Sequence, residues 1–309
     1  MQNLFLKALM LFLLVSCAAT KEKDYVFKSR KHKKAYINSY NKSLQLWDVP
    51  YQEEDIQTSF GKAHVITAGP KDGPPLVLLH GMDATSTMWF PNIRALSKNH
   101  RTYAIDYLNE AGKSQSREKS LSKEETVQWY NEIFDHYKLR KLDIVGASRG
   151  GWMATLLAIQ PNSKISRLVL LSPAQTFKGV DKAGKASSAL LLKIFPSKKK
   201  LDKTLETFSF YPEKISPVYK TQFFLANKQA KSSSSFLQMQ PFSDEDLQKI
   251  TIPVLVLIGD HDVINAEESL TRAQKYLPDC KTKTLKDAGH FLSIDQSEAV
   301  NKTIVDFLK

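Results

Sequence analysis

The first residue in this 309-residue chain with the setting for covalent chemistry is Ser148. It lies in a Gly-x-Ser-x-Gly pattern between Gly146 and Gly150. Glycines permit a turn too tight for larger residues, and such a turn would lift the serine hydroxyl to the edge of a sheet. The apolar run 142–145 indicates a buried strand before the turn, and residues 152–159 indicate a helix after it. The segment therefore predicts a strand–turn–helix unit, with an incidental serine in a glycine-rich turn as the alternative.

Two later segments could activate this serine. A serine hydroxyl is a weak nucleophile near neutral pH, so it needs a base and a residue that orients the base. Asp260 and Asp262 directly follow the apolar run 254–258, and His290 follows the last predicted strand. Ligand sites of parallel sheets lie at the carboxyl ends of their strands. We therefore expect these side chains to lie near Ser148.

The elements that must position these residues alternate between apolar strands and helices. Such alternation predicts a parallel sheet covered on both faces, which is an α/β fold. The segment between Pro173 and Ile250 interrupts it with a lysine-rich stretch that is helical in character. Because a segment this long is rarely a structureless loop, we expect residues 174–250 to form a helical cap over the sheet's active edge. Strands are expected at 75–79, 103–105, 142–145, 165–171, 252–258 and 281–285, a hairpin within 54–69, and helices at 36–47, 123–137, 266–276 and 295–307.

Four motifs follow one another along the chain: His80 with Gly81, residues 146–151, residues 259–262, and Gly289 with His290. In this order they resemble the α/β-hydrolase superfamily, and the resemblance extends from about residue 54 to the C-terminus. It implies a mostly parallel sheet flanked by helices, with a helical cap insertion. It also implies Ser148 as nucleophile, Asp262 as acid and His290 as base, with Asp260 as the alternative acid.

An oxyanion intermediate needs two hydrogen-bond donors aimed at the developing charge. By the same resemblance these are the backbone N–H groups of Arg149 and Met82, while the His80 ring orders its loop. The chain departs from many capped hydrolases in residues 106–114, where the loop is one residue longer and Asn109 replaces a glycine. Asparagine tolerates positive φ, so the turn can survive. We expect this altered loop to border the site and to affect which substrates fit.

A serine nucleophile with this fold points first to hydrolysis of carboxylic esters with small or medium acyl groups. A lactonase, an aminopeptidase of the proline-iminopeptidase type and a C–C bond hydrolase remain alternatives, because one triad serves all of them. A non-catalytic surface binding protein is an alternative from another class. No group of histidines and carboxylates has metal spacing, and no glycine-rich loop would cradle a phosphate, so we expect neither metal nor cofactor.

The N-terminus indicates export. Residues 1–16 contain Lys7 and an apolar run at 8–15, which is typical of a signal peptide and too short to span a membrane. The residues ending at Cys17 resemble the lipobox of bacterial lipoproteins, which implies lipidation of this cysteine and attachment to the outer face of a bacterial cell membrane. An ordinary cleaved signal with an incidental cysteine is the alternative.

The chain's charge bears on its partners. The net charge is +12, and lysine supplies most of it. Residues 17–35 are expected to be a lipid-bearing, basic tether that either contacts anionic headgroups or is a solvated spacer, and residues 36–309 to be the hydrolase domain. No nucleic-acid-binding module accompanies the basic residues, so nucleic acid is not expected as a partner. The sequence predicts no oligomeric state.

Overall fold

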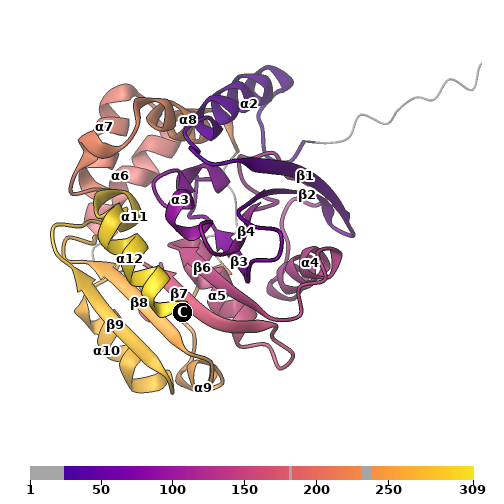
Figure 1. Cartoon of the computed structure of the whole chain (residues 1–309). Coiled ribbons are helices and arrows are strands. Elements are labelled where there is room, and N and C mark those ends of the chain that lie inside the picture. The colour runs from indigo at the N-terminus through magenta and orange to yellow at the C-terminus, as the bar shows by residue number, and fades with distance from the viewer. Residues whose placement is uncertain (1–23, 181–182, 232–237) are drawn as a thin grey trace, which may run out of the picture.

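The computed structural model describes residues 24–180, 183–231 and 238–309, which form an α/β structure around one central sheet (Figure 1). The predicted signal peptide, Cys17 and the start of the predicted tether lie outside the described residues. The strands are β1 (Tyr51–Thr58), β2 (Gly61–Ala68), β3 (Pro75–Leu79), β4 (Arg101–Asp106), β5 (Gln115–Ser116), β6 (Leu142–Ala147), β7 (Ile165–Leu171), β8 (Val254–Gly259) and β9 (Cys280–Leu285).

The sheet has the order β1-β2-β4-β3-β6-β7-β8-β9, with β5 paired to β2. The strands from β4 to β9 run parallel in this order, whereas β1, β2 and β5 are antiparallel to their neighbours. The predicted mostly parallel sheet is therefore confirmed. Its topology brings the carboxyl ends of β3, β6, β8 and β9 to one edge, where the candidate residues follow each strand.

Helices cover both faces of the sheet. Alternate residues of β3 belong to opposite cores: Leu76 and Leu78 pack on one face, Val77 and Leu79 on the other. The helices, including two short 3-10 turns, are α2 (Arg30–Leu44), η2 (Ser86–Trp89), α3 (Ile93–Leu96), α4 (Lys123–His136), α5 (Arg149–Ala158), α6 (Ala183–Ile194), α7 (Lys198–Phe208), η3 (Pro212–Lys214), α8 (Pro217–Gln229), α9 (Asp244–Gln248), α10 (Glu267–Tyr276), α11 (Leu292–Asp295) and α12 (Ser297–Phe307).

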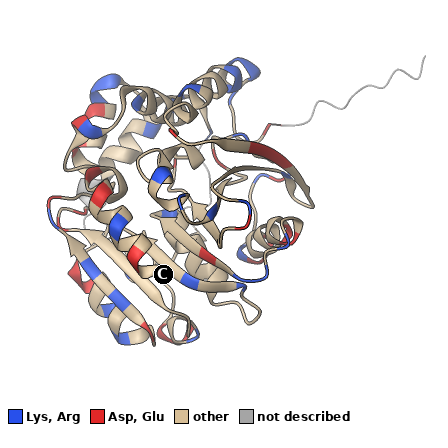
Figure 2. Cartoon of the chain, viewed as in Figure 1, with Lys and Arg blue, Asp and Glu red and all other residues tan. Residues whose placement is uncertain are grey.

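Helices α6, α7 and α8 follow β7 and lie together at one end of the sheet (Figure 1). We call residues 183–229 the cap. Helix α7 begins after Ser197, whose hydroxyl accepts a hydrogen bond from the Lys200 N–H, and its buried side includes Leu201 and Leu205. Basic residues gather on α7 and α2 (Figure 2), so some of the chain's excess positive charge lies on the cap and some on the N-terminal helix.

The folded domain begins earlier than the boundary predicted at residue 36. Val26 and Phe27 are buried, and Phe27 forms an isolated β-bridge with Ala230 beside the cap. Ser29 then caps α2 by accepting a hydrogen bond from the His32 N–H. The basic residues of 28–34 suggested a tether, but they lie on and around a helix that buries Tyr36. Within the described ranges, no helix is both long enough and apolar enough to span a membrane.

A buried histidine links the edge of the sheet to the loop 106–114. The His64 ring places Nδ1 2.7 Å from Asp55 Oδ1 and Nε2 3.0 Å from Glu53 Oε2, and its backbone N–H donates to Ser114 Oγ. Burial lowers the pKa of His64, but the bond to Glu53, the charge of Asp106 and the bond to Asp55 outweigh burial, so the net pKa is raised. The hydrogen bond from His64 is the main cause that lowers the pKa of Glu53 to about 2.

This arrangement predicts a pH-dependent stability contribution. The pKa of His64 is higher in the folded state, so its protonation stabilises the fold. This contribution to the free energy of unfolding is fully present below the ordinary histidine pKa of about 6.5, and it is lost as pH rises through the folded-state pKa. We expect His64→Gln to lower Tm at pH 6 and the difference from wild type to shrink at alkaline pH. Thermal denaturation across this range measures it, with exposed His136→Gln as control. A difference that is constant with pH would contradict the assignment.

Candidate active site

The backbone of Ser148 makes a sharp turn between β6 and α5. Its φ is 52° and its ψ is −115°, and its N–H donates a 2.8 Å hydrogen bond to the Leu171 carbonyl. A Cβ on Gly150 would lie 2.1 Å from the Leu79 carbonyl oxygen, and one on Gly146 would lie 2.4 Å from the Gly150 carbonyl oxygen. Only glycine allows these close approaches, so Gly150 is required where the turn packs on β3, and Gly146 where the end of β6 packs on the start of α5.

Three side chains form a hydrogen-bonded line at the carboxyl edge of the sheet. His290 Nε2 lies 2.8 Å from Ser148 Oγ, and His290 Nδ1 lies 2.9 Å from Asp262 Oδ1. Ser148 follows β6, Asp262 follows β8 and His290 follows β9. Asp262 and His290 are only 2% and 7% exposed. A base positioned in this way can accept the serine proton, and the carboxylate can hold the ring in the required tautomer.

Asp262 is held as a carboxylate by its surroundings. Its Oδ1 accepts hydrogen bonds from the N–H groups of Ile264 and Asn265, and its Oδ2 accepts one from the Asn265 side chain. Burial favours the neutral acid, but the His290 charge and these hydrogen bonds outweigh it, so the pKa of Asp262 is lowered. An ionised, fixed acceptor is what an imidazolium formed at His290 would need.

Asp260, the alternative acid, contacts a different part of the site. Its two carboxylate oxygens accept hydrogen bonds of 3.1 Å each from the backbone N–H groups of Asp287 and Ala288. These residues belong to the loop that carries His290. Asp260 therefore joins the turn after β8 to the turn after β9, while Asp262 contacts the histidine ring.

Sequence reasoning missed a second buried carboxylate that holds the His290 loop. Asp295 is 1% exposed and accepts hydrogen bonds from the N–H groups of Gly289 and Phe210, at 2.8 and 2.9 Å. Its side chain also accepts a hydrogen bond from the Ser209 hydroxyl. Ser209 and Phe210 directly follow α7, so Asp295 connects the cap to the residue preceding His290. Nothing in the local sequence around Asp295 signals these contacts.

The two expected oxyanion donors lie on either side of Ser148. Arg149 is the first residue of α5, where backbone N–H groups have no acceptor within the helix. Met82 follows His80 and Gly81 directly after β3, and a Cβ on Gly81 would lie 3.4 Å from the Ser148 Cβ. Both segments thus approach the serine closely enough to border a developing oxyanion.

His80 orders the loop that carries Met82. Its Nε2 accepts a 2.9 Å hydrogen bond from the Tyr107 N–H, which places the ring proton on Nδ1, 2.8 Å from the Gly81 carbonyl oxygen. Burial, with help from the Arg149 charge, lowers the pKa of His80 to about 4. The ring is therefore neutral at physiological pH and links β3 to the residue after β4.

The loop 106–114 supplies a second site residue that sequence reasoning missed. Glu110 Oε1 lies 2.6 Å from Arg149 Nη1, and Glu110 Oε2 accepts a 2.9 Å hydrogen bond from the Asp83 N–H. Burial raises the pKa of Glu110 to about 7, although Arg149 acts in the opposite direction. The extra residue in this loop was a signal that it differs from related loops, but not of what Glu110 contacts.

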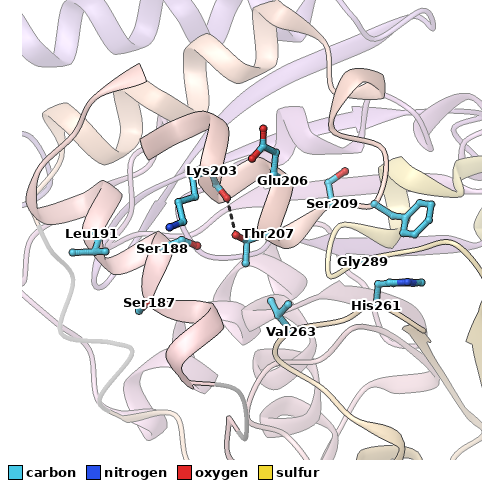
Figure 3. Close-up of a pocket in the computed structure, with 11 residues that line it drawn as sticks. Ser187, Ser188, Leu191, Lys203, Glu206, Thr207, Ser209, His261, Val263 and Gly289 are labelled. Carbon is cyan, nitrogen blue, oxygen red and sulfur yellow. Dashed lines mark hydrogen bonds between the residues drawn. The ribbon is translucent and has the colours of Figure 1, made fainter. Parts of the chain in front are cut away.

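A hollow of about 530 Å³ opens between the cap and the loops of the site (Figure 3). Ser188 and Leu191 of α6 and Thr207 of α7 line one side, while Val263 and Gly289 line the other. Val263 and Gly289 are the sequence neighbours of Asp262 and His290. Ser148, Asp262 and His290 do not themselves line the hollow, so it borders the loops that carry Asp262 and His290 and does not enclose the hydrogen-bonded line.

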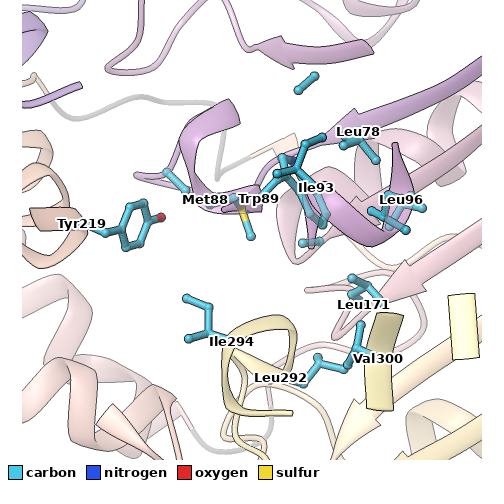
Figure 4. Close-up of a cluster of buried hydrophobic side chains, with 14 of the residues drawn as sticks. Leu78, Met88, Trp89, Ile93, Leu96, Leu171, Tyr219, Leu292, Ile294 and Val300 are labelled. Atoms are coloured by element: carbon cyan, nitrogen blue, oxygen red, sulfur yellow. The ribbon is translucent and has the colours of Figure 1, made fainter. Parts of the chain in front are cut away.

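Apolar side chains surround the other loops of the site. Phe208 at the end of α7 lies edge-on to the His290 ring, with ring centroids 5.6 Å apart. Met88, Tyr219 and Ile294 belong to one buried apolar cluster (Figure 4). Met88 Sδ also lies 3.5 Å from the Gly81 nitrogen. An apolar group bound near Ser148 would find apolar partners from both the cap and the core domain.

The described part of the chain holds no group of three or more His, Cys, Asp or Glu side chains that could bind a metal. The residues at the edge of the sheet are instead paired with one another and with backbone groups. What they can do without a further group is nucleophilic acyl transfer.

The fold and this site define an α/β hydrolase. The family model described as alpha/beta hydrolase fold matches residues 74–297, and the chain belongs to that family. It is 32% identical to carboxylesterase nap of Bacillus subtilis, over 88% of this chain and 91% of that protein. The crystal structure of naproxen esterase (carboxylesterase NP) from Bacillus subtilis superposes with a TM-score of 0.86 at 31% identity, covering 91% of this chain and all of that one. Carboxylesterase CesB (YbfK) from the same organism gives 0.80 at 28% identity, covering 90% and 98%.

The two aspartates after β8 provide a matched test of the geometry. We expect Asp262→Asn to lower kcat by about 10⁴-fold, because the amide would hold His290 in the wrong tautomer. Asp260→Asn keeps an acceptor oxygen for the His290 loop and should lower kcat far less. Steady-state kinetics on purified variants of unchanged fold measure this difference. Equal losses, or a larger loss at Asp260, would contradict the assignment.

Proposed function

We propose that this protein is a serine hydrolase that cleaves carboxylic esters through an acyl-enzyme on Ser148. The observation that carries the proposal is the unbroken hydrogen-bonded line from Asp262 through His290 to Ser148. The relatives named carboxylesterases, which align with nearly the whole chain, support the choice of esters among the reactions open to this site.

In the first half-reaction, Ser148 Oγ adds to the ester carbonyl carbon while His290 Nε2 takes the hydroxyl proton. The negative charge on the former carbonyl oxygen is stabilised by the N–H groups of Met82 and Arg149. The C–O bond to the alcohol then breaks, and the alcohol leaves with the proton held by His290. Asp262 stabilises the imidazolium during this step.

In the second half-reaction, water adds to the acyl-enzyme carbonyl and gives a proton to His290. The same two N–H groups stabilise the second oxyanion. The bond to Ser148 Oγ breaks, the carboxylic acid leaves, and His290 returns the proton to the serine. No electron transfer and no further reactant are needed.

The substrates that we propose are esters with small or medium acyl groups. Phe208 beside His290 and the cluster containing Met88 and Tyr219 offer apolar surface near the serine. The hollow of about 530 Å³ that borders the loops of Asp262 and His290 has a volume in the range of small-molecule sites, although Ser148 does not line it. The cap closes over the same edge, so long or branched substrates would have to displace it.

A substrate panel tests this proposal. We expect kcat/KM to be higher for p-nitrophenyl and alkyl esters of short and medium acyl chains than for lactones, aminoacyl amides or vinylogous diketones of similar size. Ser148→Ala should abolish turnover and fluorophosphonate labelling. A preference for aminoacyl amides or lactones would contradict the choice of esters as substrates. A wild-type protein that is not labelled and turns over none of these compounds would contradict the proposal of a serine hydrolase.

We further propose that the mature protein is anchored by lipid at Cys17 to the outer face of a bacterial cell membrane. The charged start, the apolar run 8–15 and the residues before Cys17 support this. Several acyl chains on one residue would give stable attachment, because each buried CH₂ contributes about 0.8 kcal/mol. The first described residues lie beside the cap, since the Lys231 side chain donates a hydrogen bond to the Asp24 carbonyl.

The two cysteines of the chain provide a test and its control. We expect Cys17→Ser to abolish incorporation of labelled fatty acid and to move the protein from the membrane to the soluble fraction. Cys280→Ser, at a half-buried position in β9, should leave both unchanged. A Cys17→Ser protein that remains membrane-bound would contradict lipid anchoring at this residue.

A further inference from the structure

The loop 106–114 contributes a buried carboxylate that touches the segments on both sides of the nucleophile. We propose that Glu110 is a positioning residue that holds the two halves of the oxyanion hole at a fixed separation. The proposal rests on the acyl-transfer function above. It assigns no direct contact between Glu110 and the substrate.

The two oxygens of Glu110 contact the two donor segments separately. Oε1 forms an ion pair, without hydrogen-bond geometry, with the guanidinium of Arg149, whose backbone N–H is one expected donor. Oε2 accepts from the N–H of Asp83, the residue after Met82, which carries the other expected donor. One buried carboxylate therefore contacts both the loop after β3 and the start of α5.

The surroundings of Glu110 restrict movement of this link. The side chains of Arg149 and Glu110 are 2% and 4% exposed, so water does not compete for their contact. The Arg149 guanidinium also stacks over the Tyr107 ring, with its central carbon 4.3 Å from the ring centroid.

The cap contacts the same loop from the other side. Lys193 of α6 forms an ion pair with Asp83 Oδ1, and both side chains are largely buried. Lys193, Asp83, Glu110 and Arg149 thus form a continuous series of contacts from the cap to the residue after Ser148. A cap in this position supports the loop that Glu110 holds.

Variants of Glu110 test the proposal. Glu110→Ala removes both contacts, and we expect kcat for an ester to fall by about 10²-fold with little change in KM, as for a misplaced catalytic group. Glu110→Gln keeps an acceptor for the Asp83 N–H and should give a smaller loss. Assays are run well above the pKa of Glu110 and well below the Tm of each variant, with folding checked by circular dichroism.

A matched control separates positioning from general stability. Asp143 is a buried acid on β6 that pairs with Arg167 Nη2 at 3.2 Å, near the end of the strand remote from Ser148. Asp143→Ala should lower Tm and leave kcat close to wild type. If Glu110→Ala lowers kcat no more than Asp143→Ala does, the proposal is overturned.

A transition-state analogue gives a readout that a purely structural role would not change. A trifluoromethyl ketone forms a hemiketal with Ser148 and places its oxygen in the oxyanion hole. We expect its Ki to rise in Glu110→Ala in proportion to the loss in kcat/KM, and to be unchanged in Asp143→Ala. An unchanged Ki in Glu110→Ala, with active wild type, would refute the role of Glu110 alone. Wild type that neither binds the ketone nor cleaves esters would refute the proposed function itself.

Discussion

The backbone conformation of Ser148 is the constraint on which the site depends. A positive φ at a non-glycine residue costs about 1–3 kcal/mol and persists only where the surrounding structure enforces it. Here the enforcement comes from the Ser148 N–H bonded to the Leu171 carbonyl and from Gly150 packed on the Leu79 carbonyl. These contacts come from β7 and β3, the two strands on either side of β6. The parallel sheet thus determines where the hydroxyl lies and in which direction α5 leaves.

Buried carboxylates then place the loops around this turn. Asp262 accepts hydrogen bonds within its own turn as well as contacting His290, and Asp295 ties the residue before His290 to the end of α7. Glu110 contacts the loops on both sides of the serine. A carboxylate can accept several N–H groups at once, and in a site shielded from water such bonds are strong and geometrically demanding. The loops held by Asp262, Asp295 and Glu110 differ in sequence, but in each case a buried carboxylate holds the loop by accepting hydrogen bonds from backbone N–H groups.

The sequence predicted the parts of the fold that local patterns determine. The strands at 75–79 and 165–171 match β3 and β7 at both ends, because apolar runs such as Leu76–Leu79 and Leu168–Leu171 mark strand segments buried on both faces. The N-terminal boundary was wrong, since the density of Lys, Arg and His in 28–34 concealed a helix whose buried side begins at Tyr36. Short elements such as η2 and β5 were not predicted, as their few residues carry no periodic signal.

For the site, the order of the motifs along the chain predicted Ser148, Asp262 and His290 at the carboxyl ends of strands. In the structure, the two ring nitrogens of His290 lie 2.8 Å from Ser148 Oγ and 2.9 Å from Asp262 Oδ1. Glu110 and Asp295 could not be found in the same way. Their partners Arg149 and Asp83, or Gly289 and Phe210, are backbone or side-chain groups that only the folded chain brings together. Such contacts leave no spacing rule in the sequence.

Trapping the covalent intermediate tests most directly whether Ser148 is the nucleophile. Wild-type protein is mixed rapidly with a p-nitrophenyl ester, quenched in acid during the burst of p-nitrophenol, digested and analysed by peptide mass spectrometry. We expect the mass of the acyl group on the peptide that contains Ser148, in an amount that matches the burst. Ester hydrolysis that proceeds with no acyl group on Ser148, or with the acyl group on another residue, would contradict this assignment.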